Sequence, residues 1–220
     1  MQVTEKIKIT NEDNIQLMAR YPDNYFDLAI VDPPYGIKEG SRKRENLVCG
    51  KWKNPTKKIH NPKEWDNEIP NANYYNELFR VSKNQIIWGA NYMTEFLPPS
   101  MGWIFWDKKN GNNDYSDGEL AYTSFKKGLR KFEWLWCGFF KQKPETRIHP
   151  TQKPVRLYEF CLMNYAKEND KILDTHLGSG SIAIACHNLG FELTACEIDK
   201  DYYNDSIKRI KQHISQLRIF

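Results

Sequence analysis

The sequence predicts an α/β fold with a mainly parallel sheet and helices on both faces. Its short apolar runs are continuous rather than alternating, as expected of strands that are buried on both sides. Segments with apolar residues at helical spacing lie between several of these runs, and strands that alternate with helices are typical of parallel sheets. The runs that we interpret as strands span residues 6–10, 27–32, 85–90, 103–108, 134–140, 171–177 and 192–199.

Helices are predicted where apolar residues recur every three or four positions, and a further apolar helix should begin after Gly180. No segment of clear helical period joins the runs 103–108 and 134–140, so we expect these two to form an antiparallel hairpin. The helical spacing occurs in residues 14–21, 73–81 and 154–168.

A single domain covering residues 1–220 is expected from the length and composition. A chain of 220 residues with 40% hydrophobic side chains can bury one substantial core. It has no run of about 20 consecutive apolar residues and no signal-peptide pattern at its start, so we expect a cytoplasmic protein without a membrane partner. The five cysteines form no C-x-x-C pair, which argues against a zinc site and a disulfide framework, and no metal is expected.

Positive charge is concentrated in two segments. Residues 36–66 and residues 126–147 each carry a net charge of +5, whereas the whole chain carries +4. Two basic segments on an otherwise acidic chain favour a polyanionic partner. Both segments also contain aromatic residues, among them Trp52 and Trp134, which suit base stacking next to phosphate contacts. A solvated lysine-rich loop remains the alternative for either segment.

The first basic segment, 36–66, is predicted to be a flexible loop, because it has no sustained period and is interrupted by Pro55 and Pro62. Together the two segments supply the candidate contacts to nucleic acid. These are Arg42, Lys43, Arg44, Lys51, Lys53, Lys57, Lys58, Lys126, Lys127, Arg130 and Lys131.

The first motif that carries chemistry is Asp32-Pro33-Pro34-Tyr35, at the end of an apolar run. Two successive prolines fix two φ angles, remove two N–H donors and keep the preceding residue extended. An acid and a rigid carbonyl are thereby held at the end of a strand, next to an aromatic ring. Taken alone, the motif is equally well interpreted as a plain strand-ending turn.

A second motif is a glycine loop near the end of the sequence. An apolar strand should end at Asp174, after which Gly178, Ser179 and Gly180 form a tight turn before a helix. Glycines let the backbone approach a ligand because no Cβ stands in the way. Nineteen residues after Gly178, the next strand ends at Glu197, where a carboxylate can accept both hydroxyls of a ribose. A glycine cap or plain turn is the alternative.

The same glycine spacing also satisfies a dinucleotide-binding pattern, because Gly178, Gly180 and Ala183 match G-x-G-x-x-A. A nicotinamide-dependent oxidoreductase is thus a competing interpretation. Asp174 argues against it, since an acid beside the loop repels a pyrophosphate but suits a ligand that brings an amino group or a sulfonium. The late position of the loop also leaves too little chain for a second nucleotide-binding half.

Taken together, the motifs resemble the amino-group DNA methyltransferases of the β (permuted) arrangement, in which the catalytic half precedes the cofactor half. The resemblance rests on DPPY, on H-P-T-Q-K-P at residues 149–154 and on D-x-x-x-G-S-G with an acid downstream. The segments NEDN, RVSKNQIIWGANYM, GWIFWDKK and CEIDKDYY also match motifs of this family in their order. DPPY alone is weakly specific, but the three motifs in series are strongly specific.

The resemblance implies a Rossmann-like methyltransferase fold with a seven-stranded, mostly parallel sheet that contains one antiparallel strand. It also implies S-adenosylmethionine as the cofactor, bound at the carboxyl ends of the strands. By their positions in the motifs, Glu197 should hold the ribose hydroxyls, Lys153 could reach the cofactor carboxylate, and Asp13 could approach the adenine. The residues expected to line the methionine and ribose part are Asp174, Gly178, Ser179 and Gly180.

The resemblance further implies DNA as the partner and the exocyclic amine of a flipped base as the methyl acceptor. Asp32 and the Pro33 carbonyl would accept the amine hydrogens and draw the nitrogen lone pair toward the methyl group. Pro34 would lock this geometry, and Tyr35 would offer a face for the flipped base. The acid at position 32 favours adenine N6 over cytosine N4. A methylase of RNA or protein, and a catalytically silent nucleic-acid-binding module, stay open as alternatives.

Two features depart from the family pattern. Where the family shows D-P-F-x-G-S-G-T, this sequence has Thr175, His176 and Ser181 in place of three letters. We interpret His176 as an ordinary half-buried imidazole. In addition, only the short basic stretch 126–147 is available as a reduced target-recognition region, so stringent recognition of a long site is not expected. The resemblance leaves a homodimer open.

Overall fold

The computed structural model describes residues 2–39, 63–110, 116–137, 140–142, 145 and 147–216, and the structural statements below concern these residues. Most of the predicted loop 36–66 lies outside the described part of the chain. So do seven of the basic candidates, whose roles stay predictions: Arg42, Lys43, Arg44, Lys51, Lys53, Lys57 and Lys58.

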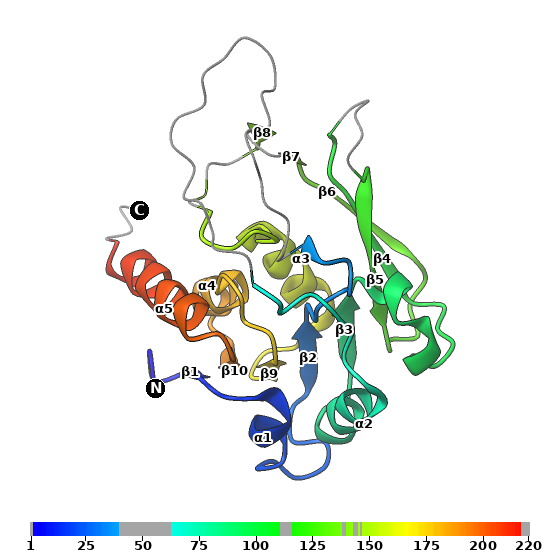
Figure 1. Cartoon of the computed structure of the whole chain (residues 1–220), viewed down its shortest axis with the longest axis horizontal. Coiled ribbons are helices and arrows are strands. Elements are labelled where there is room, and N and C mark those ends of the chain that lie inside the picture. The colour runs from blue at the N-terminus through cyan, green and yellow to red at the C-terminus, as the bar shows by residue number, and fades with distance from the viewer. Residues whose placement is uncertain are drawn as a thin grey trace.

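A sheet with eight described strands forms the centre of the molecule (Figure 1). β5 runs antiparallel to both of its neighbours, β3 and β4, whereas the other paired strands are parallel. The mostly parallel sheet with one antiparallel strand is therefore confirmed, and β6 extends it by one strand beyond the seven expected. From edge to edge the order is β1 (Ile7–Thr10), β10 (Glu192–Cys196), β9 (Lys171–Asp174), β2 (Leu28–Val31), β3 (Gln85–Trp88), β5 (Gly118–Thr123), β4 (Trp103–Asp107) and β6 (Arg130–Glu133).

The predicted hairpin between residues 103–108 and 134–140 is wrong. β4 pairs with the antiparallel β5 on one side and with the parallel β6 on the other. Neither partner has a continuous apolar run, because the first three residues of β5 are not buried and β6 buries only Phe132. The run 134–140 contributes instead to a separate antiparallel pair, β7 (Trp136–Cys137) and β8 (Phe140–Lys141).

Helices cover both faces of the sheet, as predicted. Successive residues of a strand point to opposite faces. In β2, Leu28 and Ile30 therefore pack in the cluster that contains residues of α3 (Val155–Tyr165), α4 (Ser181–Leu189) and α5 (Lys200–Ser215). Ala29 and Val31 pack in a second cluster with α1 (Asn14–Met18) and α2 (Ala72–Val81). Burial on both faces explains why the central strands are continuous apolar runs. Two short 3₁₀ helices, Ala90–Tyr92 and Thr94–Phe96, follow β3.

The last helix, α5, is the one long element that the sequence reasoning missed. Its sequence is mostly polar, and only Tyr202, Ser206, Ile207 and Ile210 are buried. Asp199 caps its start by accepting hydrogen bonds from two backbone N–H groups of the first turn. An acid followed by apolar residues three to four positions apart was the available signal.

The fold brings the two chemical motifs to the same end of the sheet. β2 and β9 are adjacent and parallel, so Asp32, which follows β2, and Asp174, which ends β9, lie at neighbouring carboxyl ends. In open parallel sheets ligands bind in the crevice outside these ends. No described helix is both long and apolar enough to cross a membrane, and the described side chains contain no group of three or more His, Cys, Asp or Glu that could hold a metal ion.

Candidate active site

The Asp-Pro-Pro-Tyr turn is held by a buried acid that no sequence motif marks. Asp66 is 2% exposed, and its carboxylate accepts backbone hydrogen bonds from Tyr35 at 2.8 Å, Gly36 at 3.1 Å and Glu39 at 2.8 Å. Gly36 has a φ of +71°, which favours glycine. Three charge-assisted bonds to one carboxylate fix the path of the chain directly after the motif.

Lys153, from the H-P-T-Q-K-P segment, points its ammonium at this turn. Its Nζ lies 2.6 Å from Asp32 Oδ1, 2.9 Å from the Tyr35 hydroxyl and 3.0 Å from Glu119 Oε2. An ammonium has three N–H donors, so these contacts use all of them. A contact from Lys153 to the cofactor carboxylate, which the sequence suggests, would require that one of the three be released.

The site therefore contains a second carboxylate, Glu119, on the antiparallel strand β5. Its Oε1 pairs with Lys108 at 2.6 Å, while its Oε2 faces Lys153. Burial would raise the pKa of Glu119, but Lys153 and Lys108 outweigh burial and lower the pKa to about 2. Burial would lower the pKa of Lys153, but Asp32 and Glu119 outweigh it and raise the pKa. The charged forms of Glu119 and Lys153 thus stabilise each other.

The two carboxylate oxygens of Asp32 differ in their hydrogen bonding. Oδ1 accepts from the Tyr35 hydroxyl at 2.7 Å and from Lys153, and no hydrogen bond to Oδ2 is seen within the described part of the chain. Burial is the main reason that the pKa of Asp32 is raised, and Glu119 adds to it while Lys153 opposes it. A carboxylate with a raised pKa is a stronger hydrogen-bond acceptor for an amine, so Oδ2 is suited to receive one N–H.

The Tyr35 ring is seated by a glycine and a second tyrosine. A Cβ on Gly89, whose φ is +68°, would lie 2.0 Å from a carbon of the Tyr35 ring. Tyr92 stacks on Tyr35 with ring centroids 5.2 Å apart and planes 15° from parallel, and it is 46% exposed. Gly89 and Tyr92 lie in the segment RVSKNQIIWGANYM, which resembles a family motif, but the sequence reasoning assigned neither of them a role at the site.

The glycine loop and its distal acid meet directly. The Gly178 N–H donates to Glu197 Oε2 at 2.8 Å, and the Asp199 N–H donates to Glu197 Oε1 at 2.9 Å. Gly178 has a φ of +51°, and a Cβ there would meet only the His149 ring, 3.9 Å away. A Cβ on Gly180, by contrast, would meet Ile210 of α5 at 2.9 Å, so this glycine also serves helix packing.

Asp174 and Ser179 lie buried in the same loop. Asp174 is 2% exposed and accepts a hydrogen bond from the His176 N–H at 3.0 Å. Burial raises the pKa of Asp174 to about 8, with further contributions from the negative charges of Asp32 and Glu197. The Ser179 hydroxyl lies 3.1 Å from that of Ser181, which donates to the Lys153 carbonyl at 2.7 Å. This bond links the glycine loop to the segment that carries Lys153.

His176 is half-buried, as predicted, and belongs to a chain of hydrogen bonds. Its Nε2 lies 3.1 Å from the Asn14 amide, and its Nδ1 lies 2.9 Å from Thr175 Oγ1, which is 2.7 Å from the Tyr74 hydroxyl. Burial lowers the pKa of His176 to about 3, so the ring is neutral at neutral pH. Because the Asn14 amide donates to Nε2, Nδ1 carries the ring hydrogen.

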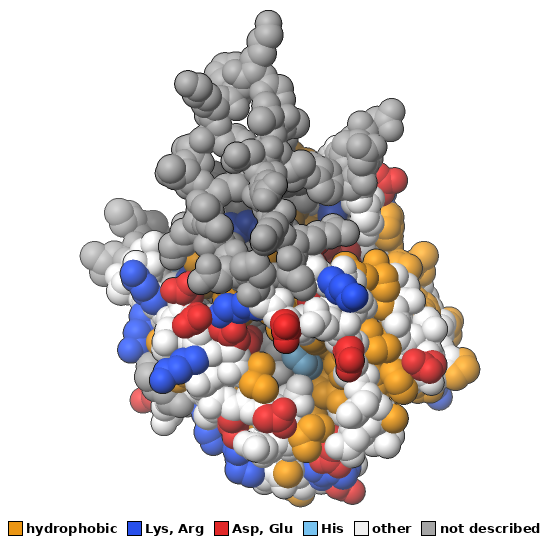
Figure 2. Space-filling view, in the orientation of Figure 1, with side chains coloured by type: hydrophobic (Ala, Val, Ile, Leu, Met, Phe, Trp, Pro, Cys, Tyr) orange, Lys and Arg blue, Asp and Glu red, His pale blue; other side chains and the backbone are white. Residues whose placement is uncertain are grey.

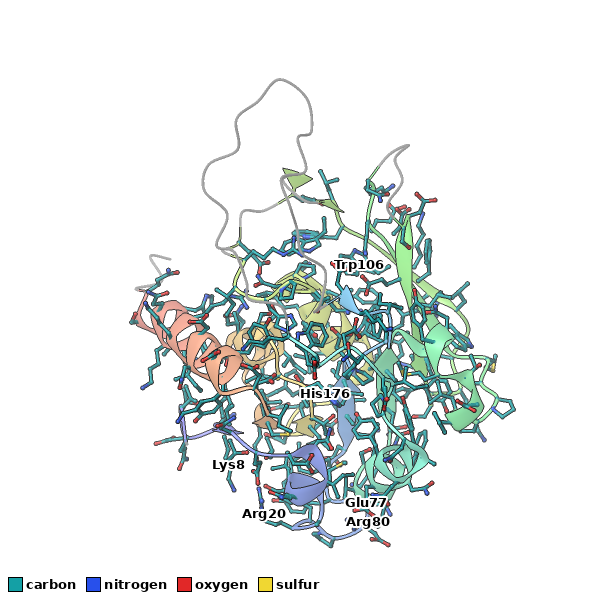
Figure 3. The ribbon with its side chains drawn as sticks, in the orientation of Figure 1. Lys8, Arg20, Glu77, Arg80, Trp106 and His176 are labelled. Carbon is teal, nitrogen blue, oxygen red and sulfur yellow. The ribbon has the colours of Figure 1, made fainter. Side chains whose placement is uncertain are left out.

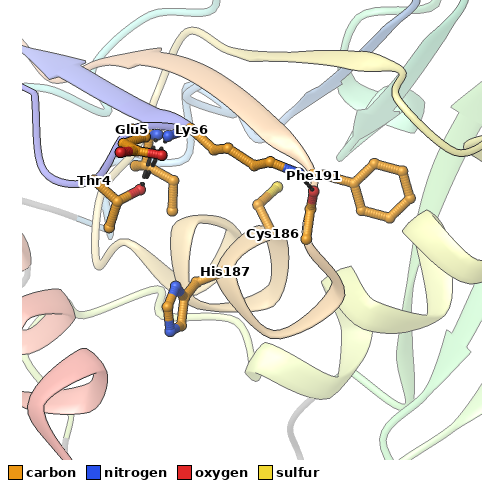
Figure 4. A pocket seen from close by; sticks show the side chains of 8 residues that line it. Thr4, Glu5, Lys6, Cys186, His187 and Phe191 are labelled. Atoms are coloured by element: carbon orange, nitrogen blue, oxygen red, sulfur yellow. Dashed lines mark hydrogen bonds between the residues drawn. The ribbon is translucent and has the colours of Figure 1, made fainter.

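A cavity of about 240 Å³ joins the two motifs, with Asp13, Pro34, Tyr74 and His176 among its lining residues. Figure 3 shows His176 near the centre of the molecule, and Figure 2 shows a histidine in a hollow at the same place. Asp13 caps α1 through Oδ1, which accepts from the Ile15 N–H at 2.8 Å. A larger cavity of about 290 Å³ lies between the start of β1 and the end of α4 (Figure 4) and contains none of the predicted site residues.

Four of the basic candidates are described, and all four are exposed: Lys126, Lys127, Arg130 and Lys131. Lys131 pairs with Asp107 at 2.8 Å and with Glu133 at 2.6 Å. Lys127 donates to the Asn164 carbonyl at 2.8 Å. Part of the positive charge of this segment is therefore already balanced by the protein itself.

Comparison with known proteins identifies the family. A family model for N6/N4-type DNA methylases matches residues 52–208, which is more than half of the chain. The chain belongs to the DNA methylase family. A nicotinamide-dependent oxidoreductase, the competing interpretation of the glycine loop, is thereby excluded. The methyl donor of this DNA methylase is S-adenosylmethionine, and the acceptor is an exocyclic amine of DNA.

Individual relatives agree with this assignment. The DNA methylase is 24% identical over 246 residues to the Type II methyltransferase M2.LlaDCHI of Lactococcus lactis subsp. cremoris, covering 94% of this chain and 90% of the relative. The structure of M1.HpyAVI with S-adenosylmethionine aligns with a TM-score of 0.54 at 22% identity, over 92% of this chain and 99% of that one. The cytosine-N4-specific PvuII DNA methyltransferase aligns with a TM-score of 0.59 at 11% identity, over 96% and 93%. These structural likenesses confirm the fold.

The residues of the DNA methylase fit the cofactor. A Cβ on Gly178 would approach the His149 ring no closer than 3.9 Å, and Glu197 lies beside Gly178 just after the next strand. Each Glu197 oxygen accepts one backbone N–H and keeps a further lone pair for a ribose hydroxyl. The buried carboxyl of Asp174 suits a ligand that brings positive charge.

Proposed function

We propose that the chain methylates adenine at N6 in DNA, and that Asp32, Pro33, Pro34 and Tyr35 form its catalytic residues. The observation that carries the methyl-transfer part of this proposal is the state of the Asp32 carboxylate, whereas the choice of adenine rests on the family tendency of motifs that begin with Asp. One oxygen is held by Tyr35 and Lys153, and the other is open to an amine. The assignment to the β arrangement is part of the proposal, and it is supported by the order of the motifs along the chain.

Asp32 and the Pro33 carbonyl hold the target amine through its two hydrogens. S-adenosylmethionine supplies an electrophilic methyl group on a sulfonium. With both hydrogens held, the nitrogen lone pair leaves conjugation with the ring and is directed at the methyl carbon. The methyl group would pass from the sulfonium sulfur to the nitrogen, and Asp32 would accept the proton that the methylated amine gives up. Tyr35 provides an aromatic face for the flipped base.

The cofactor is proposed to bind along the glycine loop. Asp174, Gly178, Ser179 and Gly180 would surround its methionine and ribose part, and Glu197 would accept the ribose hydroxyls. Asp13, at the rim of the cavity that joins the two motifs, would approach the adenine. The three sites lie at the carboxyl ends of adjacent strands, which supports this placement.

DNA is proposed to contact the two basic segments. The described candidates from Lys126 to Lys131 are exposed and border the sheet edge formed by β6. Each lysine or arginine that neutralises a phosphate releases counterions and steepens the salt dependence of binding. The segment 126–147 is proposed to act as a reduced target-recognition region, and a homodimer stays open.

The deciding experiment identifies the modified base. The purified protein is incubated with unmethylated DNA and S-adenosylmethionine, and the DNA is digested to nucleosides for mass spectrometry. N6-methyldeoxyadenosine is expected. N4-methyldeoxycytidine would retain the amino-methylase function but overturn the choice of base. DNA that stays unmodified, with cofactor binding retained, would instead indicate a catalytically silent module.

Cytosine N4 is the second candidate. It is favoured by the structural likeness to PvuII DNA methyltransferase, which is cytosine-N4-specific. Adenine and cytosine present the same kind of exocyclic amine, so the Asp32 chemistry does not distinguish between them.

A further inference from the structure

The ionic network at the catalytic turn extends one carboxylate beyond the motif. Glu119 lies on β5, the only antiparallel strand of the described sheet, and its side chain is 22% exposed. Its two oxygens contact different lysines, Lys108 at 2.6 Å and Lys153 at 3.0 Å. Its Oε2 also lies 3.4 Å from the Tyr35 hydroxyl. Glu119 thus touches both groups that hold Asp32 Oδ1, without touching Asp32 itself.

The network has two positive and two negative groups in alternation. The ion pairs connect Lys108 to Glu119, Glu119 to Lys153 and Lys153 to Asp32. A lysine placed between two carboxylates divides its attraction between them, whereas a lysine facing one carboxylate binds that group alone. Without Glu119, the Lys153 ammonium would be committed to Asp32 and would make Asp32 a poorer acceptor for another hydrogen.

We propose that Glu119 is a positioning residue that shares the Lys153 ammonium with Asp32 and so keeps the Asp32 carboxylate available to the target amine. The proposal rests on the proposed function, because it assigns Glu119 a role in the same methyl transfer. Lys108 acts on Glu119 through a different carboxylate oxygen from Lys153. It pairs with Glu119 Oε1 and so weakens the electrostatic attraction between Glu119 and Lys153.

The other ionisable groups near Asp32 come from α3 and β9. Tyr158 of α3 is buried, and burial together with the charge of Asp32 raises its pKa well above the ordinary value, so it stays neutral. Asp174 of β9 has a pKa raised to about 8 by burial, with Asp32 contributing. Neither group contacts Lys153 or Glu119 through a hydrogen bond within the described residues, so changes at Glu119 act on Asp32 through Lys153 and Tyr35.

The first test is the Glu119→Gln variant, which keeps the shape and removes the charge. We expect kcat to fall about 10- to 100-fold, by analogy with the loss of groups that orient metal ligands, while KM for S-adenosylmethionine stays within about twofold of the wild type. The acid limb of the kcat profile, where Asp32 becomes protonated, should move to lower pH, because the charge of Glu119 no longer raises the pKa of Asp32 and Lys153 then neutralises Asp32 alone.

Glu77→Gln is the matched control. Glu77 on α2 is 24% exposed, close to the 22% of Glu119, and pairs with Arg80 at 2.7 Å. It lies outside the catalytic and binding residues, so its loss should leave both kcat and the pH profile unchanged. A similar fall in kcat for both variants would assign the effect to general loss of a salt bridge and overturn the proposal.

A second variant tests the sign of the effect. In Lys108→Met, Glu119 loses its outer partner and draws more strongly on Lys153, so Asp32 loses part of its neutralisation. The acid limb should then move to higher pH, opposite to Glu119→Gln. Structural damage alone would not shift the two variants in opposite directions. Equal directions, or no shift in either variant, would overturn the proposal.

The role of Glu119 and the proposed function can fail separately. If the wild type transfers no methyl group to DNA, the proposed function fails, and the role of Glu119 in that methyl transfer is refuted with it. If the wild type is active and both variants keep its kcat and its acid limb, the function stands and the role of Glu119 is refuted. Thermal unfolding of each variant, measured with and without S-adenosylmethionine, shows whether the fold and the cofactor site are retained.

Discussion

The two halves of the site hold largely buried carboxyl groups in opposite electrostatic settings. At the catalytic turn, Asp32 and Glu119 share the ammonium of Lys153, which is 2.6 Å from one and 3.0 Å from the other. At the glycine loop, Asp174 and Glu197 accept hydrogen bonds from backbone N–H groups. No ion pair to either of these acids is seen among the residues that the structure describes.

The difference indicates what each half needs from its ligand. The half around Asp32, Lys153 and Glu119, proposed to be catalytic, is close to neutral by itself, so an uncharged base would bind there without bringing in a compensating charge. The cofactor half holds carboxyl groups that burial makes costly to ionise. A ligand with a sulfonium and an ammonium supplies the missing positive charge, and this fits S-adenosylmethionine.

The largest effect is expected for Asp32→Ala. Methyl transfer should fall by more than about 10³-fold, because the variant loses both the acceptor for the amine hydrogen and the nearest base. Affinity for S-adenosylmethionine, measured by calorimetry, should stay within about twofold because the cofactor half is untouched. Asp27→Ala is the matched control, since Asp27 precedes the same strand and also pairs with a lysine at 2.6 Å. Full activity of Asp32→Ala would refute the assignment of the catalytic half.

Asp174→Asn should weaken cofactor binding and abolish its dependence on pH. In the free wild type the pKa of Asp174 is raised to about 8, so a cationic ligand binds better as pH rises toward 8 and Asp174 loses its proton. The asparagine variant has no proton to lose, so its affinity should be flat with pH and about 10- to 100-fold lower at pH 8. Calorimetric measurement of cofactor affinity at pH 6 and pH 8 distinguishes the pH-dependent wild type from the pH-independent variant.

The stability of the same variant should change in the opposite direction. An ordinary aspartate has a pKa of about 3.9, so between that pH and about 8 the folded wild type holds a proton that the unfolded chain has lost. The stability contributed by this proton is lost as pH rises through that interval. Asp174→Asn should therefore gain melting temperature relative to the wild type at pH 8 but not at pH 4. A variant that is equally destabilised at both pH values would contradict the raised pKa of Asp174 in the folded protein.

These groups differ in how far the sequence could reveal them. Asp32 and Tyr35 are three residues apart in a proline-locked turn, and Gly178 and Glu197 keep a spacing that one βαβ unit dictates. Local chain geometry places such residues, so a pattern finds them. Glu119 and Asp66 reach the site from segments without a motif, through a strand that the apolar pattern did not reveal and through three backbone hydrogen bonds.

Lys153 shows the limit of motif reasoning in another way. Its segment was recognised, but its ammonium sits at the end of a flexible four-carbon stem, and the sequence contains no information on which acid it reaches. The fold decides this, because α3 follows Lys153 directly and α4 holds the Lys153 carbonyl through the Ser181 hydroxyl at 2.7 Å. The side chain is then directed to the catalytic turn, where Asp32 and Glu119 attract it.

Gly89→Ala is expected to damage the catalytic half without touching the cofactor half. The new Cβ would lie 2.0 Å from the Tyr35 ring, so the ring must move and Tyr35 loses its contact with Asp32. Gly190→Ala is the matched control, because its φ of +78° carries similar strain but its Cβ meets nothing within 4 Å. Both variants should lose about 1 kcal/mol of stability from strain, measured by denaturant unfolding. Only Gly89→Ala should lose kcat, by roughly tenfold; an equal loss in both would show that strain, and not the Tyr35 seat, is responsible.

The smallest effects are expected in DNA binding, where the two basic segments can be compared. Replacing Arg42, Lys43 and Arg44 by glutamine should reduce the slope of log K against log salt by up to about 2.7, if all three neutralise phosphates. Replacing Lys126, Lys127 and Lys131 should reduce it less, because Lys131 already pairs with Asp107 and Glu133 and Lys127 donates to a backbone carbonyl. Charges that the protein balances itself release few counterions when DNA binds. Fluorescence anisotropy from 50 to about 200 mM salt measures both slopes, and a larger loss for the second set would assign the main DNA contact to the edge of the sheet at β6.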